Sequence, residues 1–159
     1  MNASADRPPP ILTCDMTSAP DTLAGRLAEY RELFAQSLIG RDERGPGVRF
    51  RFRAGPGVAD RVRDLAARER ACCGFLRSAV TAHGSEVWWD LSAASEAAGP
   101  LLAELARLPD TLPEGNEAVA RRFRDHGLTV IASAAASAAC ISRSSSRTSS
   151  AAGRSRTSG

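Results

Sequence analysis

Residues 48–53 (Val-Arg-Phe-Arg-Phe-Arg) alternate strictly between apolar and charged side chains. In an extended chain, neighbouring side chains point to opposite faces, so Val48, Phe50 and Phe52 share one face and three arginines share the other. The segment is therefore predicted to be a strand of a sheet with one buried face and one solvated face. The rest of the domain has to supply a second layer that covers the apolar face.

Helical periodicity and turn residues predict the other elements of the domain. Strands are expected at 11–16, 48–53, 76–82 and 86–91, and helices at 21–40, 58–74 and 95–109. The polar residues 41–47 are predicted to be a turn, and residues 83–85 have the length of a hairpin loop. The element order is then β-α-β-α-β-β-α. The expected fold is α+β, a two-layer sandwich in which helices pack on one face of a small mixed sheet.

The length of 159 residues permits one core-forming domain and a tail. We assign residues 1–9 to a disordered lead and residues 10–110 to the α+β domain. Residues 111–141 are assigned to one more helix and an Ala-rich apolar segment. Residues 142–159 form a Ser/Arg-rich tail that is expected to be disordered, because its side chains cannot build a packed core.

The apolar residues 128–141 leave two hypotheses open. The segment is either an exposed Ala-rich stretch or the start of a membrane helix whose reading frame was lost near Cys140. The chain has no run of 18 or more apolar residues, so no intact membrane span is expected. The first ten residues lack the pattern of a secretion signal, and a cytoplasmic location is expected.

The net charge of +3 comes from the tail of the chain. All 21 basic residues are Arg; four of them and no acidic residue lie in 127–159, so the preceding part carries 17 Arg against 18 acidic residues. The row Arg49, Arg51 and Arg53 could bind phosphate or RNA, but no aromatic partner is expected on its face. We interpret the row as a solvated outer face, and no nucleic-acid partner is expected.

Residues 69–76 (Glu-Arg-Ala-Cys-Cys-Gly-Phe-Leu) have the clearest chemical pattern. On a helix, Glu69 lies three and four residues before Cys72 and Cys73, which puts its carboxylate one turn from both sulfurs. Adjacent cysteines rarely form a disulfide with each other. They are suited to a shared soft ion, or to one metal-facing sulfur beside one core-facing sulfur. In the cytoplasm all four cysteines of the chain are expected to be reduced.

Both cysteines lie at the C-terminal end of the expected helix, which disfavours a thiolate. Binding of a cation is therefore favoured over thiolate catalysis. Cys14, on the first strand, could supply a third sulfur. Three thiolates suit Hg(II) or As(III), whereas Zn(II) needs a fourth ligand such as His83, Glu69 or Asp15. Glu69 is interpreted as a group beside the metal ligands that accepts a cysteine proton, with an ordinary surface ion pair as the alternative. Cys140 lies outside the domain.

At these positions the chain resembles a group of small, poorly characterised bacterial proteins. These proteins have an early strand bearing Cys, a Glu-x-x-Cys-Cys-x-Phe-Leu signature, a hairpin, and Gly-Pro before a Leu-rich helix. The matching segments here are Cys14-Asp15-Met16, Glu69 to Leu76 and Gly99-Pro100, and the resemblance covers residues 11–108. It implies heavy-metal or metalloid resistance and a mercury-type thiolate site. The chain departs from the pattern at Gly74, where a larger residue or Pro is common.

The leading hypothesis is a small cytoplasmic module that binds a thiophilic metal or metalloid, Hg(II), As(III) or Zn(II). Its ligands would be Cys72, Cys73 and Cys14, with Glu69 beside them. One alternative is a thiol-dependent redox or metal-transfer enzyme with one of the paired cysteines as nucleophile. Another is a structural or interaction domain whose cysteines only fill the core. No feature of the sequence requires a cofactor.

Overall fold

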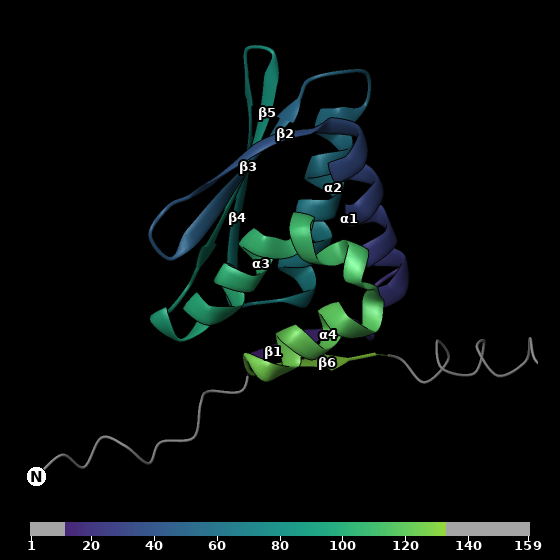
Figure 1. Ribbon diagram of the computed structural model, residues 1–159, viewed down its shortest axis with the longest axis vertical. Helices are drawn as coiled ribbons and strands as arrows, with labels where there is room; N and C mark the ends of the chain where they lie inside the picture. The colour runs from purple at the N-terminus through teal and green to yellow at the C-terminus, as the bar shows by residue number, and fades with distance from the viewer. Residues whose placement is uncertain (1–11, 133–159) are drawn as a thin grey trace, which may run out of the picture.

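The structure is a computed structural model that describes residues 12–132; the expected lead (1–9) and tail (142–159) lie outside the described residues. Over the described residues the fold is α+β, as predicted, with four α-helices and two sheets (Figure 1). The elements are β1 (Leu12–Asp15), α1 (Leu23–Ser37), β2 (Leu38–Glu43), β3 (Gly47–Arg53), α2 (Val58–Cys72), β4 (Leu76–His83), β5 (Glu86–Ala93), α3 (Gly99–Thr111), α4 (Asn116–Asp125) and β6 (Leu128–Ile131), with short 3-10 helices at Glu96–Ala98 and Leu112–Glu114.

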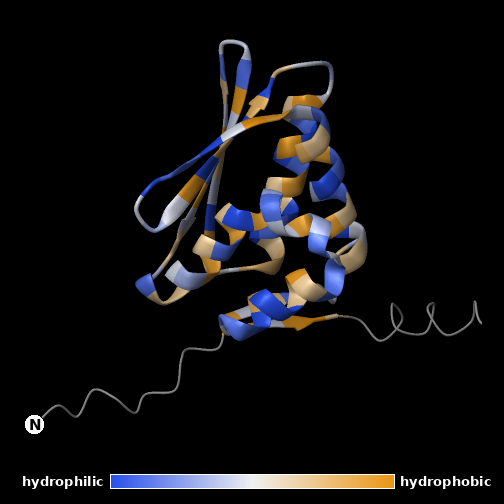
Figure 2. Ribbon diagram, viewed as in Figure 1, coloured by the Kyte–Doolittle hydropathy of each residue, from blue (hydrophilic) through white to orange (hydrophobic). Residues whose placement is uncertain are grey.

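The larger sheet has the strand order β2-β3-β5-β4 and is antiparallel throughout. The alternation in β3 places its apolar side chains on the inner face, where Phe50 and Phe52 are fully buried. Trp89 of β5 lies opposite Phe50 and is equally buried. Helices α1, α2 and α3 lie on this side of the sheet (Figure 1), and each helix carries both hydrophobic and hydrophilic residues (Figure 2). The expected two layers are therefore present.

The outer face of the sheet carries the arginine row. Arg49 donates to both carboxylate oxygens of Asp90 at 2.7 and 2.9 Å, and Arg51 lies 3.2 Å from Asp42. The expectation that this face has no aromatic residue is wrong, because the Arg49 guanidinium lies 4.2 Å from the ring centroid of Trp88. Arg49 and Arg51 are thus paired with side chains from neighbouring strands of the same sheet, which supports the interpretation as an outer face.

Strand β2 covers the end of the expected helix 21–40, which stops at Ser37, and the first three residues of the expected turn 41–47. It begins directly after α1 and pairs with β3 from Leu38↔Phe52 to Glu43↔Val48, with an irregularity at Leu38/Gly40. Its sequence, Leu-Ile-Gly-Arg-Asp-Glu, does not alternate, and β2 is an edge strand that pairs with β3 through backbone groups. Charged side chains are common on such edges because they discourage pairing with another chain.

The first predicted strand does not join the larger sheet. Strand β1 pairs in parallel with β6, from Leu12↔Leu128 to Asp15↔Ile131, so the expected single mixed sheet is wrong. Residues 128–131 are thus a strand, and the hypothesis of a lost reading frame near Cys140 concerns residues outside the described range. Among residues 12–132, no helix combines the length and the apolar character needed to cross a bilayer.

The packed part of the chain continues beyond residue 110, where we expect the domain to end. Leu112 and Val119 belong to the hydrophobic core, and Phe123 and Leu128 pack against it. The expected helix 95–109 begins later, at Gly99, and runs through Pro109 to Thr111. Together with β1 and β6, helix α4 closes the end of the molecule shown at the bottom of Figure 1.

The neighbouring tryptophans on β5 provide a test of this layering. Trp89→Ala removes a fully buried ring and should lower the free energy of unfolding by about 3–5 kcal/mol. Trp88→Ala removes an outer-face ring whose contact with Arg49 is worth about 1 kcal/mol or less. Urea unfolding of both variants measures the difference. Equal losses would contradict the assignment of inner and outer faces.

Candidate functional site

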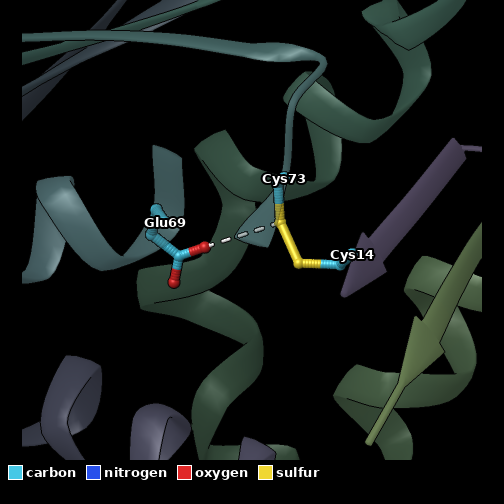
Figure 3. Close-up of side chains that lie close together, drawn as sticks. All are labelled: Cys14, Glu69 and Cys73. Carbon is cyan, nitrogen blue, oxygen red and sulfur yellow. Dashed lines mark hydrogen bonds between the residues drawn. A yellow bond between two sulfur atoms is a disulfide. The ribbon is translucent and has the colours of Figure 1, made fainter. Parts of the chain in front are cut away.

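Cys14, Glu69 and Cys73 come together at the closed end of the molecule. One ligand atom from each residue, a sulfur or a carboxylate oxygen, lies within 4.8 Å of the other two. Figure 3 shows Cys14 on β1 facing Cys73, with the Glu69 carboxylate directed toward the Cys73 sulfur. All three residues are buried, with exposed fractions of 6%, 8% and 4% for Cys14, Glu69 and Cys73.

Local structure explains why these side chains point inward. Helix α2 buries one stripe that includes Val62, Leu65 and Glu69, so helical spacing carries the carboxylate to the core. Cys73 is the C-cap residue, and its backbone N–H donates to the carbonyl of Glu69 at 2.8 Å. Its backbone leaves the helical conformation there, which separates its side chain from that of Cys72. In β1, the period of two buries Cys14 between exposed neighbours.

The two site cysteines form a disulfide, with their Cα atoms 4.4 Å apart. The expectation that all four cysteines are reduced is therefore wrong for Cys14 and Cys73. The reason is the position of β1, which brings Cys14 to the end of α2 although 59 residues separate the two in sequence. In the disulfide, the Cys73 sulfur has no hydrogen, so its 3.9 Å distance to Glu69 Oε2 is a contact; a reduced thiol could donate there.

The other expected ligands lie elsewhere. Cys72 is a free, buried cysteine that belongs to the hydrophobic core and is not part of the cluster of Cys14, Glu69 and Cys73. His83 stacks on Trp88 at the outer face of the larger sheet. Asp15 is exposed and accepts hydrogen bonds from Thr17. Of the three fourth ligands considered for zinc, only Glu69 is therefore at the site.

Arg26 is a site residue that we did not predict. It is 2% exposed, and its Nη1 lies 3.4 Å from Glu69 Oε1. It also donates to both oxygens of Asp21, at 3.0 and 2.7 Å. The signal was present in the sequence, because Arg26 falls within the apolar stripe of α1 between Leu23 and Tyr30. A charge in such a stripe is either directed out of the core or paired within it.

A chain of alternating charges runs from the site to the surface. Asp21 also accepts from Arg68 at 2.7 Å, and Arg68 donates to both oxygens of Glu29 at 2.6 and 2.7 Å. These residues link α1 and the segment before it to α2. The Arg26–Glu69 pair is thus held by fully hydrogen-bonded charges on its outer side, which is the condition for a stable buried pair.

Burial dominates the electrostatics at the inner end of this chain. It raises the pKa of Glu69, although the charge of Arg26 and hydrogen bonding to Tyr30 and Arg26 oppose the shift. Burial and the nearby Glu69 charge also raise the pKa of Tyr30 well above its usual value. Burial alone would lower the pKa of Arg26, but Asp21 and Glu69 reverse this effect and keep the guanidinium charged. Glu69 is therefore a carboxylate that accepts a proton more readily than an exposed one.

A cavity of about 290 Å³ opens beside the site. Cys14, Cys73 and Glu69 form part of its wall. The rest is mostly apolar and comes mainly from helices α1, α3 and α4: Leu23, Leu27, Leu101, Leu105, Val119 and Phe123; Arg26, Tyr30, Arg124 and Thr129 are its polar members. Two sulfurs and a proton-accepting carboxylate therefore face a space large enough for a small organic group.

Glu69→Gln tests the raised pKa. Between the ordinary Glu pKa of about 4.3 and the raised value, the folded protein holds a proton that the unfolded chain has released. Over that window the free energy of unfolding of the wild type falls as the pH rises, and the loss is complete above the raised pKa. The variant lacks this titration. We therefore expect the wild type to lose stability relative to Glu69→Gln as the pH rises from about 4.3 through the raised pKa of Glu69.

Urea unfolding of the oxidised protein at a series of pH values measures this difference. Glu96→Gln, at an exposed carboxylate, is the control and should follow the wild type. A wild type that gains stability relative to Glu69→Gln as the pH rises would mean that attraction to Arg26 outweighs burial.

The site has to be interpreted from its own geometry. Comparison of the chain with protein-family models, with curated proteins and with solved structures finds no match in any of the three. The buried cluster of Cys14, Cys73 and Glu69, with Arg26 behind the carboxylate and an apolar cavity in front, is the basis for assigning a function.

Proposed function

We propose that the reduced protein binds a thiophilic metal or metalloid ion through Cys14 and Cys73. The observation that supports this proposal is the convergence of two sulfurs and one carboxylate within 4.8 Å at a buried position. Thiolates select soft ions, and burial protects the bound ion from water and competing ligands. The proposal replaces the expected pair Cys72 and Cys73 with Cys14 and Cys73, and it gives Cys72 a role in the core only.

The disulfide is the oxidised form of this site. A thiol reductant has to supply two electrons and two protons to convert it to two thiols. A divalent ion then displaces both thiol protons to give a dithiolate, so two protons leave for each ion bound. The C-terminal end of α2 does not stabilise a thiolate at Cys73, so this thiolate depends on the bound ion for its stabilisation. Glu69, whose pKa is raised by burial, is placed to accept the proton of Cys73.

The ligand set favours some ions over others. Two sulfurs suffice for Hg(II), which binds two thiolates strongly. Zn(II) prefers four ligands, and the cluster offers only two sulfurs and one carboxylate. The resemblance to bacterial proteins linked to heavy-metal resistance supports the same choice. We propose a cytoplasmic location, because there the cysteines would be kept reduced and able to bind.

Single Cys→Ser substitutions test the ligand assignment. They are made in the full chain with Cys140→Ser, so that this additional thiol does not contribute. After reduction, the parent chain should bind one Hg(II), measured by ultraviolet absorption of the sulfur–mercury bonds and by competition with a free dithiol. Cys14→Ser and Cys73→Ser should each weaken binding more than 100-fold, beyond the roughly 10–100-fold typical for loss of a group that supports the ligands. Glu69→Gln should weaken it by that smaller factor.

Cys72→Ser is the matched control, since it removes the neighbouring buried thiol that lies outside the cluster. It should leave the affinity unchanged. If Cys72→Ser weakens binding as much as Cys73→Ser while Cys14→Ser does not, the adjacent pair is the ligand set. If none of the variants differs from the parent, the chain has no thiolate site.

The disulfide itself favours a second candidate function, thiol–disulfide exchange. In that reaction the reduced pair transfers two electrons to a substrate disulfide, releases two thiols and returns to the Cys14–Cys73 disulfide. The burial of both sulfurs opposes attack on a large substrate. We therefore expect the protein, supplied with a thiol reductant, to reduce a protein disulfide no faster than the reductant alone. Turnover above this background that is lost in Cys73→Ser but kept in Cys72→Ser would favour the enzyme instead.

A further inference from the structure

We infer that the ligand of this site is a trivalent metalloid carrying one apolar organic group, of the type R–As(III), with the metalloid on Cys14 and Cys73 and the group R in the cavity. This inference rests on the proposed function and names its ligand class. It follows from the number of sulfurs, the nature of the cavity wall and the charge balance at the site.

Arsenic(III) forms three bonds, and the number of sulfurs decides which arsenical fits. Inorganic As(III) is best satisfied by three thiolates, but the cluster contains only two, and Cys72 is not part of it. Glu69 is a poor third ligand, because a carboxylate oxygen is hard and this carboxylate is already paired with Arg26. An arsenical with one carbon substituent needs two sulfurs and no other protein ligand.

The cavity supplies the place for that substituent. Cys14 and Cys73 lie in its wall, so a group bonded to an atom that bridges their sulfurs can extend into it. Its volume of about 290 Å³ exceeds the roughly 150 Å³ of an apolar protein cavity that holds benzene. Its leucines, Val119 and Phe123 offer contacts to an aryl or short alkyl group and few partners for a polar one.

The reaction and its charge balance also suit an apolar space. In R–As(OH)₂, two As–O bonds break and two As–S bonds form, each thiol proton leaves with a hydroxyl group as water, and arsenic stays trivalent. The product is neutral. Arg26 is paired with Glu69 and Asp21, and Arg124, which also lies in the cavity wall, is paired with Glu117, so the charged side chains beside the cavity have partners.

The test compares arsenite with phenylarsonous acid on the reduced full chain carrying Cys140→Ser. Each arsenical is titrated in competition with dithiothreitol, and its affinity for the protein is expressed relative to its affinity for dithiothreitol. This ratio removes the difference between the two arsenicals in their general affinity for dithiols. We expect the protein to favour the phenyl compound over arsenite by at least tenfold relative to dithiothreitol. Cys14→Ser should abolish this preference. Because this variant keeps both Cys72 and Cys73, the loss would show that the preference does not come from an arsenical bridging those two cysteines.

Ala120→Phe tests the cavity separately from the sulfurs. Ala120 lies in the cavity wall on α4, so a phenyl ring at this position fills the space. The variant should bind arsenite like the parent and lose the preference for phenylarsonous acid. Ala103→Phe, the same change at an exposed position of α3 outside the cavity wall, is the control and should keep it.

The outcomes separate this inference from the proposed function. If neither arsenical binds and Hg(II) does not bind either, the proposed function fails. If Hg(II) or arsenite binds but the phenyl compound has no advantage, the organic ligand is overturned and the thiolate site remains. An advantage that survives in Ala120→Phe would also overturn it. Should Ala120→Phe fail to fold, the comparison on the parent chain decides the question.

Discussion

The buried ion pair between Arg26 and Glu69 is the interaction on which the rest of the site depends. A carboxylate in the core is costly unless its charge is balanced, and here Arg26 balances it from the facing helix. Asp21 and Arg68 extend the pairing outward, so that one set of charges joins the beginning of α1 to the end of α2. Fixing these two helix ends fixes where the chain leaves α2, and hence where the sulfur of Cys73 points.

The larger sheet and the site meet different structural demands. Three helices cover the apolar face of the sheet, and aromatic rings such as Phe50 and Trp89 fill the space between the layers. Toward β1 and β6 the covering is less complete. Here α4 and the small parallel sheet border a cavity, and Arg26, Glu69, Cys14 and Cys73 lie in its wall. Dense packing thus supports the fold in one region, while looser packing provides a binding volume in another.

The sequence predicts those features that depend on local periodicity. Alternation in β3 and helical spacing in α2 correctly give the strand, its buried face and the position of Glu69 one turn before Cys73. Pairing between strands leaves no such periodic signal in the sequence. Strand β2 pairs with β3 through its backbone, and β6 begins an apolar, Ala-rich segment whose pairing with β1 cannot be inferred from its own residues. The choice between Cys72 and Cys73 depends on the backbone turn at the C-cap. Arg26 could have been identified as a charge within an apolar stripe, but its partner could not.

The pairing of β1 with β6 also has a consequence for how the molecule assembles. The paired strands of the larger sheet are closer in sequence than β1 and β6, so they lose less chain entropy when they meet and form earlier. Strand β1 has its only described strand partner near the other end of the described chain, with Leu12 beside Leu128. We therefore expect Cys14 to take its place late in folding. During synthesis on a ribosome, a chain that has not yet released β6 would hold a finished sheet and an incomplete site.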